Sequence, residues 1–225
     1  MNSLGDTIGT DDLDILFARS TDDGTTWTAP APLNTNASSD MGADAFPQVT
    51  TDGQGNWLAT WHSGDSLGST IGGDFDILMA RPTDAGVTWT APAALNTNAV
   101  GDSGNDYVPQ LTTDGQGIWI AVWVSTDWLG DTIGTDFDIL VARSTDAGVT
   151  WTAPAALNAN AVGDAADDTQ PQVTTDEQGT WIAVWRSKHS FGDTIGTDWD
   201  ILVARSTDDG TTWTAPAPLN TGVGA

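Results

Sequence analysis

The chain has 225 residues, with 31 acidic against 6 basic side chains and a formal net charge of −25. This balance argues against nucleic acid or an anionic membrane as a partner, because phosphate binding depends on clustered lysine and arginine. Cysteine is absent, which excludes disulfides and thiolate zinc sites, and no apolar run approaches the ~20 residues of a membrane helix.

A repeat of 62 residues organises the chain. Tryptophan recurs at this interval at Trp27, Trp89, Trp151 and Trp213, and segments 76–102 and 138–164 differ at only three of 27 positions. Such self-similarity indicates a tandem array of one structural unit. We expect a single domain over residues 1–225, divided into a half repeat (1–46) and three repeats (47–108, 109–170 and 171–225).

Each repeat is expected to contribute four strands, and the half repeat two. In chain order, residues 13–34 hold the first strand pair. In the repeat 109–170, the expected strands are 109–114 and 118–125 around a GQG turn, then 138–144 and 149–158 around a TDAG turn. β-Branched and aromatic residues on either side of a glycine-containing turn are typical of hairpins, and no segment has the apolar spacing of a helix.

The strand expected at 118–125 is apolar on both faces. Trp119 and Trp123 alternate along it with Ile120 and Val122, so the strand must be covered on both sides. Small four-stranded sheets that stack radially meet this requirement, since each sheet buries the faces of its neighbours. The sequence therefore predicts an all-β fold, a β-propeller built from 62-residue four-stranded repeats.

The second turn of each unit carries a recurring motif, as in STDAGVTW at 144–151. The pattern Ser-x-Asp-x-Gly-x-Thr-Trp resembles the Asp-box, or BNR repeat, of sialidase-like propellers, and Pro82 is the one departure from its first serine. We expect the aspartate to accept hydrogen bonds from its own turn, the glycine to adopt positive φ and the tryptophan to close over the turn. The structural Asp-box residues are Asp22, Gly24, Trp27, Asp84, Gly86, Trp89, Asp146, Gly148, Trp151, Asp208, Gly210 and Trp213.

The long connections lie opposite the Asp-boxes if the strands alternate in direction. Segments 63–76 and 96–109 are two of these loops, and the loops carry many of the acidic side chains. Loops that are longer than a connection requires are where function usually lies. We therefore expect a strongly acidic loop face that contacts a carbohydrate or protein ligand.

The resemblance implies exo-sialidase hydrolysis, which uses three arginines for the substrate carboxylate, a tyrosine nucleophile paired with a glutamate, and an aspartate as acid and base. Four of the five arginines, including Arg143, precede Asp-boxes and belong to the other face, which leaves Arg186. The sole tyrosine, Tyr107, and the sole glutamate, Glu177, are expected on opposite faces. We expect a non-catalytic binding, display or scaffold module; the alternative is a fragment or relative of an exo-sialidase or another glycoside hydrolase.

Two sets of loop residues are candidate sites. Paired carboxylates offer the hard oxygen ligands that calcium prefers, with a solvated acidic surface as the simpler alternative. These pairs are Asp74 with Asp76, Asp136 with Asp138, and Asp198 with Asp200. Candidate ligand contacts are Trp128, Trp199 and Arg186, although the two tryptophans could instead pack beneath their loops.

The strand count gives seven hairpins, or three and a half blades. Because propellers close with about four blades or more, an unpaired edge and an uncovered blade face are expected. Such surfaces recruit other chains, which predicts a homo-oligomer or part of a longer propeller. The first residues, MNSLGDTIG, lack the basic start and apolar core of a signal peptide, so extracellular or cell-surface placement is an expectation for a parent protein only.

Overall fold

The computed structural model describes residues 8, 12–82, 84, 86–163, 165–191 and 195–220. These residues form fourteen β-strands and no helix, so the all-β class predicted from the sequence is confirmed. A helix long and apolar enough to cross a membrane is accordingly not found in this part of the chain.

The strands form one two-stranded and three four-stranded antiparallel sheets, in chain order. The first sheet contains β1 (Leu16–Phe17) and β2 (Ala31–Pro32). The second contains β3 (Asp44–Thr51), β4 (Trp57–Ser63), β5 (Asp76–Ala80) and β6 (Ala93–Ala94). The third contains β7 (Asp106–Thr113), β8 (Trp119–Ser125), β9 (Asp138–Ser144) and β10 (Ala155–Ala156). The fourth contains β11 (Asp168–Thr175), β12 (Trp181–Ser187), β13 (Asp200–Ser206) and β14 (Ala217–Pro218).

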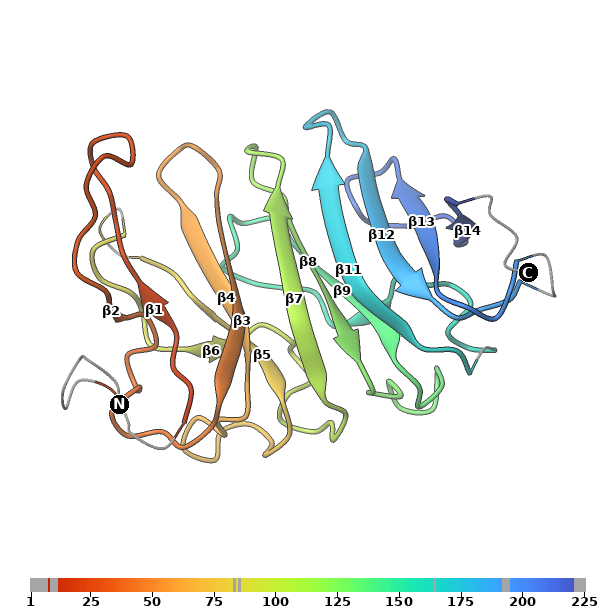
Figure 1. The fold of residues 1–225 in the computed structure, drawn as a ribbon, viewed down its shortest axis with the longest axis horizontal. Helices are drawn as coiled ribbons and strands as arrows, with labels where there is room; N and C mark the ends of the chain where they lie inside the picture. The colour runs from red at the N-terminus through yellow and green to blue at the C-terminus, as the bar shows by residue number, and fades with distance from the viewer. Residues whose placement is uncertain are drawn as a thin grey trace.

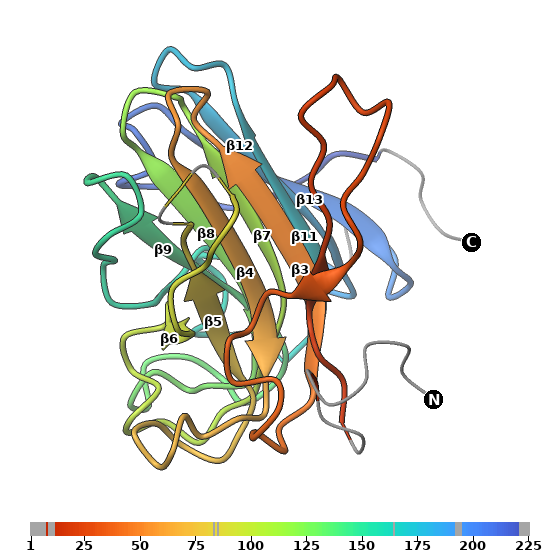
Figure 2. The same ribbon diagram turned by 90° about the vertical axis from the view of Figure 1, so that its left-hand side faces the viewer.

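The sheets stand side by side like the blades of a propeller, with β1 and β2 at one end and β11 to β14 at the other (Figure 1). Strand β7 contacts both β3 and β11, so the first strand of each four-stranded sheet lies on the inner side of the fan. Figure 2 shows β3, β4, β5 and β6 following one another outward in that order. The arrangement is three and a half blades of a β-propeller.

The core lies between blades and is built from the second strand of each. Along β8, Trp119 and Trp123 are fully buried on one face, and Ile120 and Val122 are fully buried on the other. The tryptophan face packs against the preceding blade at Leu58, and the isoleucine face packs against the following blade. This is the two-sided coverage that the apolar strand required.

The inner strands begin three residues earlier than the sequence indicated. In β7 the residue before Pro109, Val108, has a φ of 51° and forms a bulge between the pairs of Tyr107 and Gln110. Proline has no N–H to donate to the ladder, so the strand passes it by a bulge and then resumes pairing. The resumed ladder reaches Asp106, which lies opposite Ser125. The same geometry recurs at Asp44 and Asp168.

The outer strands are much shorter than expected. In place of a strand over residues 149–158, β10 contains only Ala155 and Ala156. Pro154 interrupts the ladder because it lacks an N–H. The segment is still attached on both sides of this proline, since Thr152 N donates to Arg143 O at 2.9 Å and Leu157 N donates to Ile139 O at 2.7 Å.

Candidate functional site

The Asp-box turns close on their own hydrogen bonds. In the third turn, Asp146 accepts from Thr150 N at 2.9 Å, from Thr150 Oγ1 at 2.6 Å and from Ser144 Oγ at 2.8 Å. These donors hold the pKa of Asp146 at about 2, below its usual value. Gly148 has a φ of 76°, a conformation that glycine adopts without a steric cost. The turns around Asp22 and Asp208 are built in the same way.

The Asp-box tryptophans close over their turns unequally. Trp89, Trp151 and Trp213 are half-buried, whereas Trp27 is 64% exposed. Trp27 still donates its indole Nε1–H to Gly24 O of its own turn at 3.2 Å, so its exposure comes from missing neighbours and not from an open turn. Trp89 contacts Phe17 of the preceding sheet, with ring centres 5.8 Å apart, whereas among the described residues no sheet precedes β1 and β2 to cover Trp27.

At the Asp-box end, polar side chains join one blade to the next. The guanidinium Nε of Arg143 donates to Asp209 O at 2.6 Å, in the following Asp-box. Gln116 Nε2 likewise donates to Glu177 O at 2.8 Å, between successive inner-hairpin turns. The arginine that precedes the Asp-box of the third blade is thus a blade-to-blade contact.

At the opposite end, hereafter the loop end, a buried asparagine joins two blades. Asn96 Nδ2 donates to Asp76 Oδ1 at 2.8 Å and to Asp106 Oδ2 at 2.9 Å, while Asn96 Oδ1 accepts from Ile77 N at 3.0 Å. All three polar side chains are 0% exposed. Asn34 and Asn158 make the equivalent bridges. Sequence reasoning missed these asparagines, although their 62-residue spacing was a visible signal.

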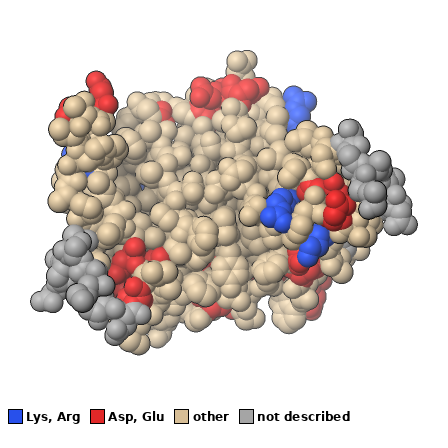
Figure 3. Space-filling view, in the orientation of Figure 1, with Lys and Arg blue, Asp and Glu red and all other residues tan. Residues whose placement is uncertain are grey.

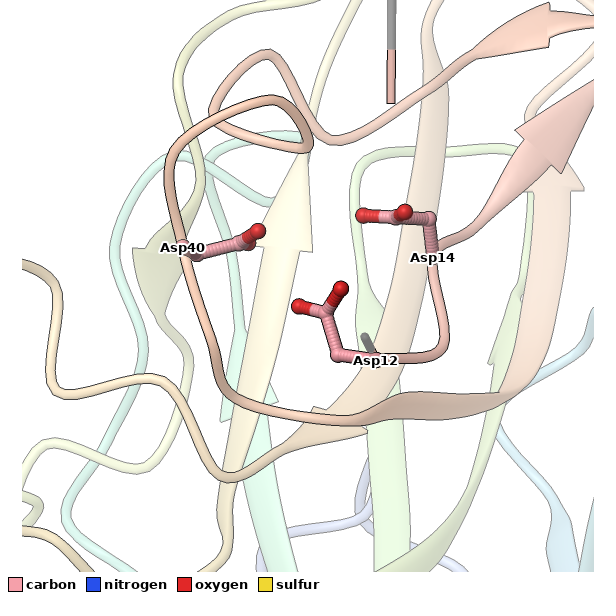
Figure 4. Close-up of side chains that lie close together, drawn as sticks. All are labelled: Asp12, Asp14 and Asp40. Carbon is pink, nitrogen blue, oxygen red and sulfur yellow. The ribbon is translucent and has the colours of Figure 1, made fainter. Parts of the chain in front are cut away.

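The loop end also gathers carboxylates into triads. Asp74, Asp76 and Asp102 each place an oxygen within 4.8 Å of the others, and so do Asp12, Asp14 and Asp40. Figure 4 shows the second set: the three side chains point toward one another, two from the segment before β1 and one from the loop after β2. The predicted pair Asp74–Asp76 is therefore brought together with a third aspartate that was expected only as part of the acidic loops.

For the two remaining predicted carboxylate pairs, the described residues do not include a third aspartate that completes a triad. Asp136 and Asp138 repeat the arrangement of Asp74 and Asp76, but residue 164, which corresponds to Asp102, lies outside the described residues. Asp198 and Asp200 precede and open β13. The triad around Asp12 was missed because the pairs were sought only in full repeats, whereas the half repeat already contains one.

Burial and mutual repulsion raise the pKa values of the triad carboxyls. Desolvation, together with repulsion from the neighbouring carboxylates of Asp76 and Asp74, raises the pKa of Asp102 to about 7. Desolvation likewise raises the pKa of Asp76 to about 6, against the hydrogen bond from Asn96. Asp40, in the other triad, has a pKa raised to about 6 by the same causes.

The expected strongly acidic loop face is wrong in part, because many of these aspartates lie inside the molecule. Seven loop-end aspartates are buried, namely Asp44, Asp76, Asp106, Asp127, Asp138, Asp168 and Asp200. On the visible face of the molecule, acidic side chains occur along both the upper and lower margins and are not gathered at one end (Figure 3). Many of the carboxyl groups at the loop end therefore lie in the interior of the molecule.

A cationic and aromatic patch interrupts the repeat in the last blade. Trp199 is 38% exposed, and the Arg186 guanidinium and Lys188 ammonium lie 4.1 Å and 4.6 Å from its ring centre. Lys188 also pairs with Asp167 at 3.4 Å. Figure 3 shows basic side chains beside acidic ones over this sheet. The third predicted ligand contact, Trp128, is 49% exposed in the preceding blade, which lacks these cations.

The residues compared with a sialidase centre lie at opposite ends of the sheets. Tyr107 is the second residue of β7, at the loop end, where its ring lies 5.3 Å from that of Phe75 and 5.4 Å from that of His62. Burial raises the pKa of the Tyr107 hydroxyl. Glu177 lies in the turn between β11 and β12, at the Asp-box end. The length of an inner strand separates the two side chains.

Comparisons with known proteins agree with this architecture. A leech intramolecular trans-sialidase aligns with a TM-score of 0.61 and 12% identity, over 95% of this chain and 47% of its own. An α-L-arabinofuranosidase of Fusarium graminearum aligns with a TM-score of 0.57 and 16% identity, over 92% and 58%. The Hadza microbial sialidase Hz136 aligns with a TM-score of 0.53 and 16% identity, over 93% and 53%.

These identities establish a shared fold, and the chain spans about half the length of these solved structures. No curated protein matches the chain by sequence. The model of the BNR repeat-like domain matches residues 5–223, which is nearly the whole chain. With its Asp-box turns and its four-stranded blades, the chain belongs to the BNR repeat-like family, as the sequence motif indicated.

Proposed function

We propose that this chain is a non-catalytic BNR propeller module that binds a ligand at its loop end, through the patch formed by Arg186, Lys188 and Trp199. The observation that carries the proposal is the pair of cations over a partly exposed indole ring. This patch can offer an anionic ligand two positive charges next to an apolar surface. A saccharide with a carboxylate group, or an acidic protein segment with an aromatic or aliphatic neighbour, has the matching chemistry.

The repeat itself supports a special role for the patch. The positions equivalent to Arg186 are Val124 and His62, and the position equivalent to Lys188 in the preceding repeat is Thr126. Residues 171–220 match the preceding repeat at 38 of 50 positions, and five of the twelve differences fall within residues 186–191. Positive charge in a chain of net charge −25 is scarce, so its concentration at one exposed aromatic ring favours recognition of a partner.

The test is binding of the full chain to an array of neutral and carboxylate-bearing oligosaccharides and to acidic peptides. We expect the carboxylate-bearing set to bind. A variant with Arg186→Val and Lys188→Thr, which restores the residues of the preceding repeat, should lose most of this binding. Trp128→Ser is the matched control, because it replaces an exposed tryptophan outside the patch with the serine found at the equivalent position, 190, of the last repeat, and it should leave binding unchanged. Equal binding by the reverted variant would contradict the proposal.

The alternative is glycoside hydrolysis, which the enzymes among the structural neighbours favour. The separation of Tyr107 from Glu177, and the use of Arg143 in a blade contact, weigh against a sialidase mechanism within this chain. We therefore expect no turnover of a fluorogenic sialoside between about pH 4 and pH 8, the range in which carboxylate and tyrosine chemistry operates. Turnover that Tyr107→Phe abolishes would establish the alternative.

A further inference from the structure

We propose that Asp74, Asp76 and Asp102 hold a calcium ion at the junction of two blades, and that Asp12, Asp14 and Asp40 hold a second at the preceding junction. The three side chains come from two separate segments: Asp74 and Asp76 lie before and at the start of β5, and Asp102 lies in the loop between β6 and β7. One oxygen of each lies within 4.8 Å of the other two. This inference is independent of the patch around Trp199.

The strongest observation is a set of buried oxygens without a hydrogen-bond donor. Asp76 is 0% exposed; its Oδ1 accepts from Asn96, while its Oδ2 is buried and has no donor. Both carboxylate oxygens of Asp102 and one of Asp74 are also buried without a donor. Buried acceptors of this kind are normally paired, and each unpaired one destabilises the fold. A cation shared by the triad satisfies them together.

The charge around the triad points the same way. The carboxylates of Asp74 and Asp102 are also repelled by that of Asp127, in the neighbouring loop. The ion pair found among the described residues, Lys188 with Asp167, lies in the last blade. No basic side chain contributes to the pKa of Asp74, Asp76 or Asp102. Buried carboxylates need a positive partner or a proton, and a cation fills that role at neutral pH.

The same arrangement occurs twice, at a 62-residue offset. In the half repeat, Asp12 and Asp14 precede β1 and Asp40 follows β2. Asp12 Oδ2 and Asp40 Oδ1 are again buried without a donor. Figure 4 shows the three carboxylates directed at a common point. Two blade junctions with different neighbouring blades both contain the triad. The triad therefore follows from the repeated sequence and its fold.

Calcium fits the ligand set better than other common metals. All the converging atoms are carboxylate oxygens, with no histidine or cysteine among them. Hard oxygen ligands from flexible loops suit calcium, whereas zinc prefers nitrogen and sulfur, and magnesium demands a regular octahedron. The triad lies beside Asn96, which links Asp76 to the first residue of β7. A bound ion would therefore connect the outer loop of one blade with the inner strand of the next.

The experiment uses the full chain freed of metal with a chelator. Calcium is added at constant ionic strength, set with sodium chloride, because any salt screens a net charge of −25. We expect calorimetry to detect at least two binding equivalents and the melting temperature to rise with calcium. Asp102→Asn should remove one equivalent and part of the rise, without lowering the melting temperature in chelator, because it also relieves repulsion.

Matched variants make the outcome decisive. Asp131→Asn neutralises an exposed loop carboxylate outside both triads and should keep the full calcium response. Asp40→Asn should remove one equivalent at the other triad, and it replaces Asp102→Asn if that variant does not fold. An unchanged melt and no binding heat in millimolar calcium would overturn the proposal, and so would equal loss in Asp131→Asn or an equal response to magnesium.

Discussion

Ile120 and Ile182 occupy the same position in consecutive repeats, but only Ile120 is covered by a following blade in the structure. Ile120 is 0% exposed, and it packs onto Gly210 in the Asp-box of the following blade. Ile182 is 40% exposed, because no further blade follows β11 to β14 in the structure. We predict that truncation to alanine is much more damaging at Ile120 than at Ile182.

The size of the difference follows from burial. Ile→Ala removes three carbon atoms, worth about 0.8 kcal/mol each when they are fully buried, or about 2.4 kcal/mol in all. At Ile120 the cavity left behind raises the loss to about 3 to 4 kcal/mol. Ile182 is 40% exposed, so about 60% of the transfer contribution is lost there, or about 1.4 kcal/mol, and no closed cavity forms. The expected difference is about 2 kcal/mol.

The assay is urea unfolding of Ile120→Ala, Ile182→Ala and the unmodified chain, at a protein concentration where sedimentation shows a monomer. The free energies of unfolding are then compared at a common slope. Equal losses at the two positions in the monomer would refute the blade stacking described above. Equal losses that develop only at higher protein concentration would instead show that a second copy covers the end face.

Three further predictions concern the turns and the ends of the array. The pKa of Asp146 is lowered to about 2, so the stabilisation by its carboxylate is present above about pH 4 and is lost as the pH falls toward 2. The difference in melting temperature between Asp146→Asn and the unmodified chain should therefore shrink from about pH 4 to about pH 2. Gly24→Ala and Gly148→Ala both place a side chain at positive φ, but only the latter also approaches the Leu58 side chain, at 3.1 Å, so its urea midpoint should fall further. Because Ile182 and Trp57 are 40% and 38% exposed, the chain should self-associate at micromolar concentration, and a compact monomer by light scattering at all concentrations would contradict this.

The blades could be predicted because their sequence signals are local and repeated. The alternation of Trp119 and Trp123 with Ile120 and Val122 predicts a strand that is buried on both faces. The side chain of the Asp-box aspartate forms its hydrogen bonds within its own turn, so the geometry of that turn depends little on the rest of the fold. Strand direction then separates the Asp-box end from the loop end.

The loop end could not be predicted in the same way, because its interactions are non-local. The bulge at Val108 brings Asp106 into the ladder, and nothing in the local sequence except Pro109 marks it. Asn96 lies 20 residues after its partner Asp76 and 10 residues before its partner Asp106. Without the fold, a buried aspartate and a solvated one look alike in the sequence, which is why the expected acidic surface is in part interior.

The two ends of the repeat use the same residue type in opposite electrostatic states. At the Asp-box end, the Asp146 carboxylate accepts four hydrogen bonds, and its pKa falls to about 2. At the loop end, both oxygens of Asp102 lack a donor, and its pKa rises to about 7. An aspartate of the first kind needs nothing beyond its own turn, whereas one of the second kind is stabilised only by a proton or an external cation. Any ionic control of this propeller's rigidity should therefore act at the loop end, where the blades meet through Asn96, and should leave the Asp-box turns unchanged.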